Sequence, residues 1–406
     1  MVDTGSVVGG TLPLFVARSV ERASTSERSL APQPIVRQHA VSFHGSGSEY
    51  FRIWIVNLLL TLLTLGLYHP WAKVRRLRYF HTHTQVAGHA FDFHGQPRQM
   101  LRGTLLVGLM LGAYSLAGHF SPLAQGVALL LLAGLWPALW RASMQFRLAN
   151  TSWRGMRFRF TATAPEAYWV MAPAFLALVA VGGAFAAVPD AAPSAAAMAL
   201  PLLLLGAFYF CLPYLWLRLK RYQHGHYAYG QQQTRLKTTV GAAYGVFLRI
   251  VGVALLATLG LGGLVVLVLW AFGAGADAGA WQGALMAAAP LLFLLLLVTQ
   301  TVPRAYATSR LQNLLWSRTG NADLRFRSEL GFAPLARLLL KNWLLVMLTL
   351  GFYWPWAAVA VARLRLQAVS LRSRDSLDAL VAGATAARGD AAGDAAGDAL
   401  GIDLGL

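Results

Sequence analysis

Long stretches without charge dominate the pattern of hydrophobic and polar positions in this chain. Residues 103–140 contain no Lys, Arg, Asp or Glu, and residues 160–217 and 250–303 contain three acidic residues and no basic one. A helix needs about 20 apolar residues to cross the hydrocarbon core of a bilayer. Each stretch is therefore long enough for two crossings, and the predicted spans are 103–119, 122–140, 167–187, 197–217, 246–270 and 284–303.

The basic residues lie between these helix pairs. The turns inside the pairs, around residues 121–122, 190–194 and 273–279, carry no Lys or Arg, whereas the segments that join one pair to the next carry many. Lys and Arg accumulate in the cytoplasmic loops of membrane proteins. We therefore expect the joining segments to face the cytoplasm and the short turns to face the opposite side.

The joining segments also carry the alternation of residues that is typical of β-strands. Thr84 and Val86 are followed by Phe91 and Phe93, and similar residues recur at 151/153 and 158/160, 227/229 and 234/236, and 317/319 and 324/326. Alternating residues of this kind favour short strands. Each joining segment is therefore predicted to contain a β-hairpin.

Two half-hairpins remain at the ends of this pattern. Residues 41–45 resemble residues 91–95, and Val369 and Leu371 occupy the place of a first strand without a partner. We predict that these ends pair, with Phe43 facing residue 369 or 371, and that five tandem repeats close into a ring without exposed sheet edges. The alternative is two unrelated short strands. The predicted repeats cover about residues 41–90, 91–157, 158–233, 234–323 and 324–374.

A break between an uncharged helix and a second, aromatic helix occurs near both ends of the apolar region. Residues 57–78 and 342–363 share at least eight identities at one constant offset, which indicates a duplicated unit. The segments 52–70 and 343–355 each have room for one helix rather than two. If both ends of each segment are cytoplasmic, the segments are re-entrant, and if each crosses once, the protein has eight spans. The residues leave both alternatives open.

Together these patterns predict an all-α polytopic membrane protein with a small cytoplasmic β-hairpin layer. It would have six full transmembrane helices and two re-entrant or spanning helices. The composition agrees, because 57% of the 406 residues are apolar and 12% are charged. Residues 1–38 are predicted to be a disordered arm, residues 39–374 the membrane domain, and residues 375–406 a disordered tail rich in Ala, Gly and Asp.

The formal net charge of +18 indicates contact with anionic phospholipid headgroups. Nucleic acid is not an expected partner, because the basic residues are spread over several segments without a nucleic-acid-binding motif. A second copy of the chain or another membrane protein is a further expected partner. The predicted headgroup contacts are Lys73, Arg75, Arg76, Arg78, Arg218, Lys220 and Arg221.

The N-terminal part of the membrane domain resembles a known family. The resemblance is carried by F-H-G-x-G-x-E-Y-F at 43–51, L-T-L-G-x-Y-x-P-W-A at 63–72, R-Y at 78–79 and G-x-x-F-x-F-x-G at 88–95. These motifs look like the YjgN family of bacterial inner-membrane proteins, which is built from a domain of unknown function. The resemblance extends over about residues 41–372 and implies a multi-pass protein of the bacterial inner membrane. It supplies neither an activity nor catalytic residues.

The two breaks are the leading candidates for a functional site. They could form a constriction or a lipid-binding notch, or else anchor the helices at the interface through aromatic rings and at depth through Asn and Thr hydrogen bonds. The candidate residues are Asn57, Thr64, Gly66, Tyr68, Pro70 and Trp71 in the first break and Asn342, Thr349, Gly351, Tyr353, Pro355 and Trp356 in the second.

Four histidines provide a candidate metal site. His81 and His83 follow an Arg-Tyr pair, and His224 and His226 follow a second one. Neutral imidazole suits Zn, Cu or Ni, but no Cys or acidic cluster accompanies these residues. The alternative is that strands at a headgroup boundary tolerate histidine, and no cofactor is expected.

These observations predict a non-enzymatic protein, either a pore or a passive carrier for a small solute or lipid. The alternative is a membrane scaffold or sensor that recruits partners through the basic β-layer. An enzyme ranks third, because the sequence contains no GxSxG, HExxH, Walker A or CxxC motif. Ion-coupled transport is disfavoured, because the predicted spans contain no carboxylate at depth.

Overall fold

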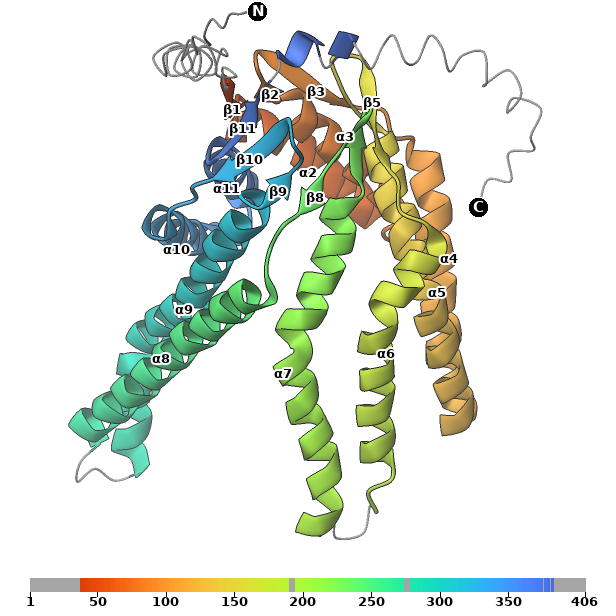
Figure 1. Ribbon diagram of the computed structural model, residues 1–406. Helices are drawn as coiled ribbons and strands as arrows, with labels where there is room; N and C mark the ends of the chain where they lie inside the picture. The colour runs from red at the N-terminus through yellow and green to blue at the C-terminus, as the bar shows by residue number, and fades with distance from the viewer. Residues whose placement is uncertain (1–36, 190–193, 274–277, 375, 380, 383–406) are drawn as a thin grey trace, which may run out of the picture.

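A computed structural model describes residues 37–189, 194–273, 278–374, 376–379 and 381–382. Six long helices extend from one side of a β-sheet (Figure 1). All six are long and apolar enough to cross a membrane, which confirms the six predicted spans. They are α4 (Pro97–Phe120), α5 (Pro122–Ala149), α6 (Ala164–Ala186), α7 (Ala195–Gly225), α8 (Val240–Gly273) and α9 (Ala278–Trp316).

Several of these helices are longer than the predicted spans, because the basic segments that follow the apolar stretches continue the same helix. The turn predicted at 121–122 is present, with the Ser121 hydroxyl accepting the Ala124 N–H at 3.1 Å as the cap of α5. The turns predicted at 190–194 and 273–279 lie largely outside the described residues. The long helices therefore form three hairpins, as the charge pattern predicted.

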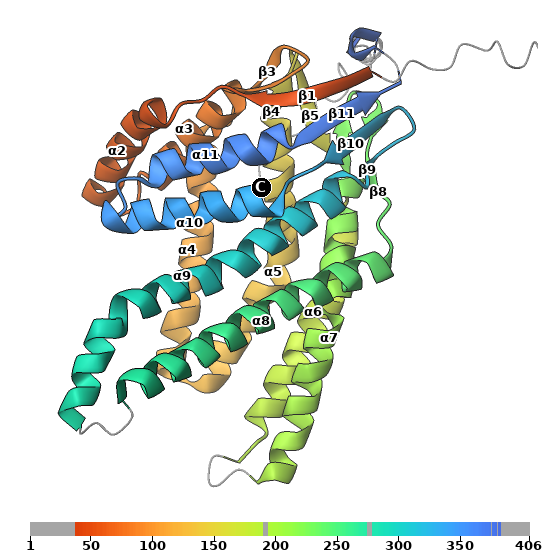
Figure 2. The same ribbon diagram turned by 90° about the vertical axis from the view of Figure 1, so that its left-hand side faces the viewer.

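Two shorter hairpins flank the long ones in the sequence. They are formed by α2 (Gly47–Leu63) with α3 (His69–Thr82), and by α10 (Phe332–Leu348) with α11 (Trp354–Gln367). The strands before and after each pair are neighbours in the sheet, so the chain leaves the sheet and returns to it. In Figure 2 these hairpins stay close to the sheet, whereas α8 and α9 extend further away. This return of the chain agrees with the re-entrant alternative, while insertion of the two short hairpins into the bilayer stays a prediction.

The sheet is a nearly closed ring of 11 strands in the order β7-β6-β5-β4-β3-β2-β1-β11-β10-β9-β8. All its pairings are antiparallel, and only Thr234 separates β7 from β8. The sheet is larger than the small hairpin layer that the sequence suggested. The strands are β1 (Arg37–Phe43), β2 (Thr84–Val86), β3 (His89–Phe93), β4 (Thr151–Trp153), β5 (Met156–Phe160), β6 (Tyr227–Tyr229), β7 (Gln232–Gln233), β8 (Arg235–Leu236), β9 (Thr319–Gly320), β10 (Leu324–Ser328) and β11 (Val369–Ser373).

The order strand, helix, helix, strand recurs around the ring. In each such unit the two strands pair with each other and the two helices form a hairpin. Neighbouring hairpins also touch, through α3 and α4, α5 and α6, α7 and α8, α9 and α10, and α11 and α2. The last contact joins helices from opposite ends of the sequence. A circular arrangement of hairpins thus lies beneath the circular sheet, while the origin of the units by duplication stays a prediction.

The two end strands pair, as the sequence predicted, but in a different register. His39 faces Leu371 and Ala40 faces Ser370, whereas Phe43 faces Thr84 of β2. The predicted partners of Phe43 were wrong, because β1 divides its length between two neighbours. Its first residues pair with β11 and its last ones with β2. The strand begins at Arg37, within two residues of the predicted end of the N-terminal arm.

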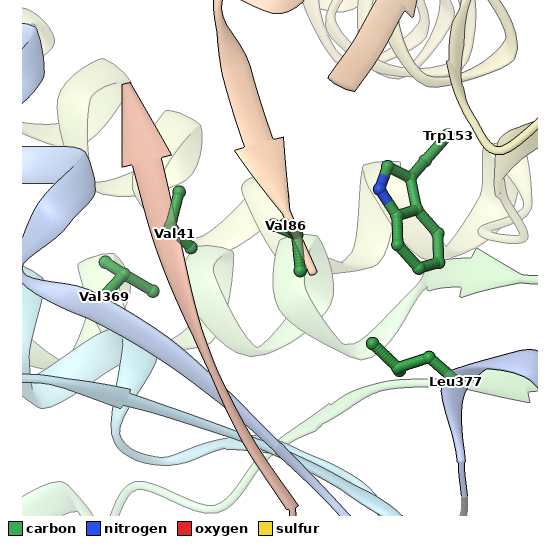
Figure 3. Close-up of a cluster of buried hydrophobic side chains, with 5 residues drawn as sticks. All are labelled: Val41, Val86, Trp153, Val369 and Leu377. Atoms are coloured by element: carbon green, nitrogen blue, oxygen red, sulfur yellow. The ribbon is translucent and has the colours of Figure 1, made fainter. Parts of the chain in front are cut away.

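Apolar side chains fill the inside of the ring. The buried residues Val41, Val86, Trp153 and Val369 come from four different strands and meet there (Figure 3). Leu377 joins them with 6% of its surface exposed, so the segment after β11 folds back onto the ring. Leu377 thus lies within the segment that the sequence assigned to the tail. Burial of a leucine in an apolar core contributes about 1.5–3 kcal/mol to this packing.

Ring closure predicts a disulfide between the chain ends. We expect Ala40→Cys and Ser370→Cys, in a Cys211→Ala background, to cross-link on oxidation and to raise the free energy of unfolding by about 2–4 kcal/mol, because the bridge closes a very long loop. Detection is by a gel shift that dithiothreitol reverses, combined with unfolding in detergent. A folded protein in which this pair, and also the facing pair 39 and 371, stays reduced would contradict the pairing.

Candidate functional site at the two helix breaks

The two breaks have the same backbone conformation. Leu65 and Gly66 have φ angles of 49° and 91°, and Leu350 and Gly351 have 50° and 95°. In both turns the glycine N–H donates across the turn at 2.7 Å, to the carbonyl of Thr61 or of Val346. Glycine enters the left-handed region without strain, whereas leucine does so at a cost of about 1–2 kcal/mol. The predicted glycines are therefore required by the turn.

Threonine and proline complete both turns. The Thr64 hydroxyl donates to the Leu60 carbonyl at 2.7 Å and accepts the Tyr68 N–H at 3.0 Å. Thr349 makes the equivalent bonds at 2.7 and 2.9 Å. Pro70 and Pro355 lie in the first turn of the returning helices, where a missing N–H costs nothing, and both are fully buried. These candidate residues build the turn.

The aromatic candidates stack on each other. The rings of Tyr68 and Trp71 are 5.9 Å apart at an interplanar angle of 13°, and those of Tyr353 and Trp356 are 5.9 Å apart at 14°. Trp356 also stacks on Phe51 of α2 at 4.9 Å, which ties the two short hairpins together. Tyr68 and Trp71 thus brace the first returning helix, and Tyr353 and Trp356 brace the second.

The two candidate asparagines are buried. Asn57 is 6% exposed and Asn342 is 5% exposed. The Asn342 amide donates to the Ala357 carbonyl at 3.4 Å, which links α10 to α11. Both Oδ1 atoms are buried without a partner among the described residues. The burial supports the structural alternative, in which asparagine joins helices.

The leucines at the hairpin tips were not among the site residues predicted from the sequence. Leu65 and Leu350 are 94% and 90% exposed, although both have left-handed backbones. Leu63 and Leu348, at the ends of the preceding helices, are each 79% exposed. The signal was present, because Thr-Leu-Gly occurs in both copies, but only the turn geometry reveals that this leucine points out of the fold.

The predicted headgroup contacts have several roles. Arg75 lies over the Tyr68 ring, 5.8 Å from its centroid, and Arg76 lies over Phe80 at 6.0 Å. Arg218 donates to the Trp169 carbonyl at 2.7 Å, and Lys220 to the Gln223 side chain at 2.7 Å. Lys73 is exposed on α3. The predicted lipid contacts of these residues stay predictions, and for Arg218 and Lys220 the structure adds an internal partner.

Arg78 and Arg221 belong to a set of side chains that join neighbouring units of the ring. Arg78 Nε donates to the Phe93 carbonyl at 3.4 Å, and Arg221 donates to the Thr238 carbonyl at 2.6 Å. In each case the donor lies on a returning helix and the acceptor lies at or just after the first strand of the next unit. Three further donors follow the same rule: Arg141 to Ala162, Asn313 to Leu330 and Arg363 to Gly45.

The four candidate metal ligands do not form one cluster. The Nδ1 atoms of His81, His83 and His226 lie 2.7 Å from the carbonyls four residues earlier, and the Nδ1 of His224 lies 3.0 Å from the Thr319 hydroxyl. Burial lowers the pKa of His81 below its usual value of 6.5. The hydrogen bond of His81 to the Leu77 carbonyl raises this pKa, and the positive charge of Arg147 lowers it. No group of three or more metal-binding side chains occurs among the described residues.

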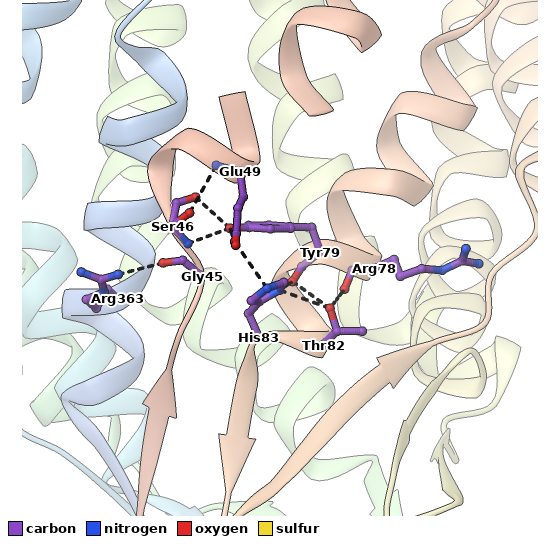
Figure 4. Close-up of polar contacts among 8 residues, drawn as sticks. All are labelled: Gly45, Ser46, Glu49, Arg78, Tyr79, Thr82, His83 and Arg363. Atoms are coloured by element: carbon purple, nitrogen blue, oxygen red, sulfur yellow. Dashed lines mark hydrogen bonds and ion pairs between the residues drawn. The ribbon is translucent and has the colours of Figure 1, made fainter. Parts of the chain in front are cut away.

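His83 and His226 each face a glutamate instead. His83 Nε2 lies 3.8 Å from Glu49, and His226 Nε2 lies 3.5 Å from Glu166. In the first cluster the Tyr79 hydroxyl donates to the Ser46 carbonyl and accepts the Ser46 N–H, both at 2.8 Å (Figure 4). Each cluster links the start of an outgoing helix to the end of its returning helix. They close the base of the hairpins, where the chain meets the sheet.

Residues 38–399 match a family described as bacterial protein of unknown function (DUF898). The inner membrane protein YjgN of Salmonella typhimurium is 32% identical over 134 residues, which are 33% of this chain and 34% of that protein. YjgN of Escherichia coli K12 is also 32% identical, over 136 residues, with the same two shares. The matched part thus spans about a third of the length of these relatives, and no solved structure matches.

The family match covers most of the chain, and the described structure contains six helices able to cross a membrane. Both findings agree with the resemblance in the sequence motifs. They support a multi-pass location in the bacterial inner membrane. The chain therefore belongs to the YjgN (DUF898) family of bacterial inner-membrane proteins of unknown function.

Proposed function

We propose that this protein is a passive carrier of membrane lipid, with its two short hairpins inserted as re-entrant segments into the leaflet on the sheet side. The sequence predicted a pore or a passive carrier for a small solute or lipid. The surroundings of the breaks favour lipid, because exposed leucines cover the tips of both hairpins while Asn57 and Asn342 are buried.

The main support for this proposal is the left-handed backbone of the two leucines at the hairpin tips. Leu65 and Leu350 accept left-handed backbones, which cost about 1–2 kcal/mol for a residue with a branched side chain. A leucine side chain exposed to water gains no favourable free energy that offsets this backbone strain, and Gly or Asn would be the usual residue at such a position. In hydrocarbon, each leucine side chain gains about 1.5–3 kcal/mol. Insertion of both tips into the bilayer therefore explains why leucine occupies this position twice.

The packing of the ring argues against a pore along its axis. Phe91, Phe158 and Tyr229 pack against the buried cluster inside the ring, with ring centroids 6.1 Å apart for the first two and 4.9 Å for the last two. Protein interiors packed in this way leave few voids larger than a water molecule. This packing disfavours the passage of a hydrated solute along the axis and supports a lipid path along the outer surface of the hairpins.

Reconstitution into liposomes tests the proposal. We expect the purified protein to move a fluorescent phospholipid between leaflets, detected by dithionite quenching, without releasing an encapsulated small solute. The double variant Leu65→Asn, Leu350→Asn should lower the initial rate at least about tenfold, because the apolar burial of about 1.5–3 kcal/mol at each tip is lost. Asparagine tolerates the left-handed region, so the turn itself is kept.

Ala87→Asn is the matched control. Ala87 has φ of 51° and lies between β2 and β3, so the same residue enters the same backbone region away from the hairpin tips. The control should retain the rate of the unchanged protein. Solute release would favour the pore instead, and the absence of both lipid movement and solute release would favour the scaffold. Equal rates in the control and the double variant would also overturn the proposed role of the tips.

A further inference from the structure

We propose that the space between α2 and α3 is a headgroup site for one anionic glycerophospholipid, an inference that rests on the proposed lipid-carrier function. A cavity of about 480 Å³ opens between the two helices of the first short hairpin. Its walls include Arg52, Ile53 and Val56 of α2 and Arg75, Arg78 and Tyr79 of α3. Arg52 was not among the residues that the sequence singled out.

The cavity gathers positive charge that the protein itself does not neutralise. Among the described residues, no carboxylate forms an ion pair with Arg52, Arg75 or Arg78. Arg75 makes a cation–π contact with the Tyr68 ring, and Arg78 Nε donates a hydrogen bond to the Phe93 carbonyl. Guanidinium groups bind phosphate in bidentate fashion, and three of them around one cavity create a site for an anion.

The nearest acid does not compensate this charge. Glu49 contacts the Tyr79 hydroxyl at 3.3 Å and His83 at 3.8 Å, at the base of the hairpin. In Figure 4 the Arg78 side chain extends away from this cluster. Tyr79 therefore separates the carboxylate from the basic side of the cavity, and the hydroxyl of Tyr79 is already used by Ser46.

The arrangement along α2 indicates an amphiphile rather than a free anion. Arg52, Val56, Leu59 and Leu63 are all exposed and are spaced by three or four residues, which places them along one face of the helix. The charged end of this face lies near the sheet, and the apolar end leads to the hairpin tip. A phosphate at the arginines would thus direct acyl chains along the leucines. Free phosphate would leave this apolar face unused.

The second short hairpin keeps only part of this arrangement. At the positions that correspond to Arg52, Arg75, Arg78 and Tyr79 it has Arg337, Ala360, Arg363 and Leu364. Arg363 donates to the Gly45 carbonyl of the neighbouring unit, whereas Arg337 Nε donates at 3.4 Å to the Ala333 carbonyl of its own helix. The site is therefore expected once in the protein and not twice. Arg337 provides a matched control for a loss of charge.

Binding measured on the full-length protein tests the inference. Tryptophan fluorescence or native mass spectrometry in neutral detergent would follow titration with phosphatidylglycerol, with phosphatidylcholine and inorganic phosphate as comparisons. The variant Arg52→Gln, Arg75→Gln leaves the Arg78 bond to the next unit intact. We expect it to bind phosphatidylglycerol about thirtyfold more weakly, taking about 1 kcal/mol for each guanidinium removed. Arg337→Gln should bind like the unchanged protein.

The outcomes separate this inference from the proposed function. Equal binding by the double variant and Arg337→Gln would overturn the site, even if lipid still moves between leaflets. Equally tight binding of phosphatidylcholine would overturn the requirement for a net negative headgroup. Competition by inorganic phosphate at the concentration of the lipid would overturn the amphiphile and indicate a phosphate site. Loss of phosphatidylglycerol binding in the double variant, in a protein that moves no lipid, would support the site and reject the carrier.

Discussion

Replacing Trp153 with alanine is expected to lower the free energy of unfolding by about 3–5 kcal/mol, the usual cost of removing a large buried aromatic side chain. Trp153 is 6% exposed inside the ring and lies 5.7 Å from the Tyr229 ring. Its indole N–H donates to the His89 carbonyl at 3.1 Å. The substitution leaves both a cavity and an unpaired carbonyl at the centre of the sheet. Unfolding in mixed detergent, followed by circular dichroism, measures the loss.

Trp136→Ala serves as the comparison for this prediction. Trp136 is 48% exposed on α5, so its removal opens no cavity, and its effect should stay below about 1 kcal/mol. A similar loss for both variants would mean that the inside of the ring does not contribute more than the surface of the helices.

The second large effect is expected from Tyr79→Phe, which should lower the free energy of unfolding by about 2–4 kcal/mol. The substitution leaves the Ser46 N–H without its Tyr79 partner and removes one of two donors to the Ser46 carbonyl, which keeps the Tyr50 N–H at 3.2 Å. Tyr79 is 6% exposed, so water replaces the lost hydroxyl poorly. Heat denaturation of the purified protein in one detergent provides the measurement.

Tyr222→Phe is the matched control in the third unit. The Tyr222 hydroxyl donates only to the Thr163 carbonyl, at 3.3 Å, so its loss should cost about 1 kcal/mol. If Tyr222→Phe proves as costly as Tyr79→Phe, the two bonds to Ser46 are not the reason for the effect. The comparison uses the same chemical change at equivalent places in two hairpins.

Local patterns explain the parts of the fold that the sequence predicted well. The apolar runs of the six spans and the alternating residues of the hairpins are each complete within one short segment, so no distant partner is needed to recognise them. The pairing of the chain ends was predictable because Phe43 and Val369 lie in incomplete copies of a pattern found elsewhere. Its register was not, because the division of β1 between β11 and β2 depends on the geometry of the ring.

The sequence identified the turns of the candidate site and the basic residues Arg75 and Arg78, but it did not single out Arg52. Gly66 and Gly351 follow from the demand for a left-handed backbone, which a sequence can reveal. Arg52 stands alone in an apolar helix, and only the return of α3 brings it to Arg75 and Arg78. Leu377 lies in a segment of low complexity, and its burial depends on a ring that strands from the whole chain must first form.

The sequence by itself determined that this protein is a polytopic membrane protein with three long hairpins, short strands between them and two broken helices, because hydrophobic periodicity and turn residues act over a few positions. Tertiary structure decided which basic side chains remain free for an anion. Arg221 and Arg363 lie in the same kind of basic, aromatic segment as Arg75, yet both are used by carbonyls of the next unit. The packing of one unit against the next brings those carbonyls within reach, and for Arg363 and Gly45 this requires the two ends of the chain to meet.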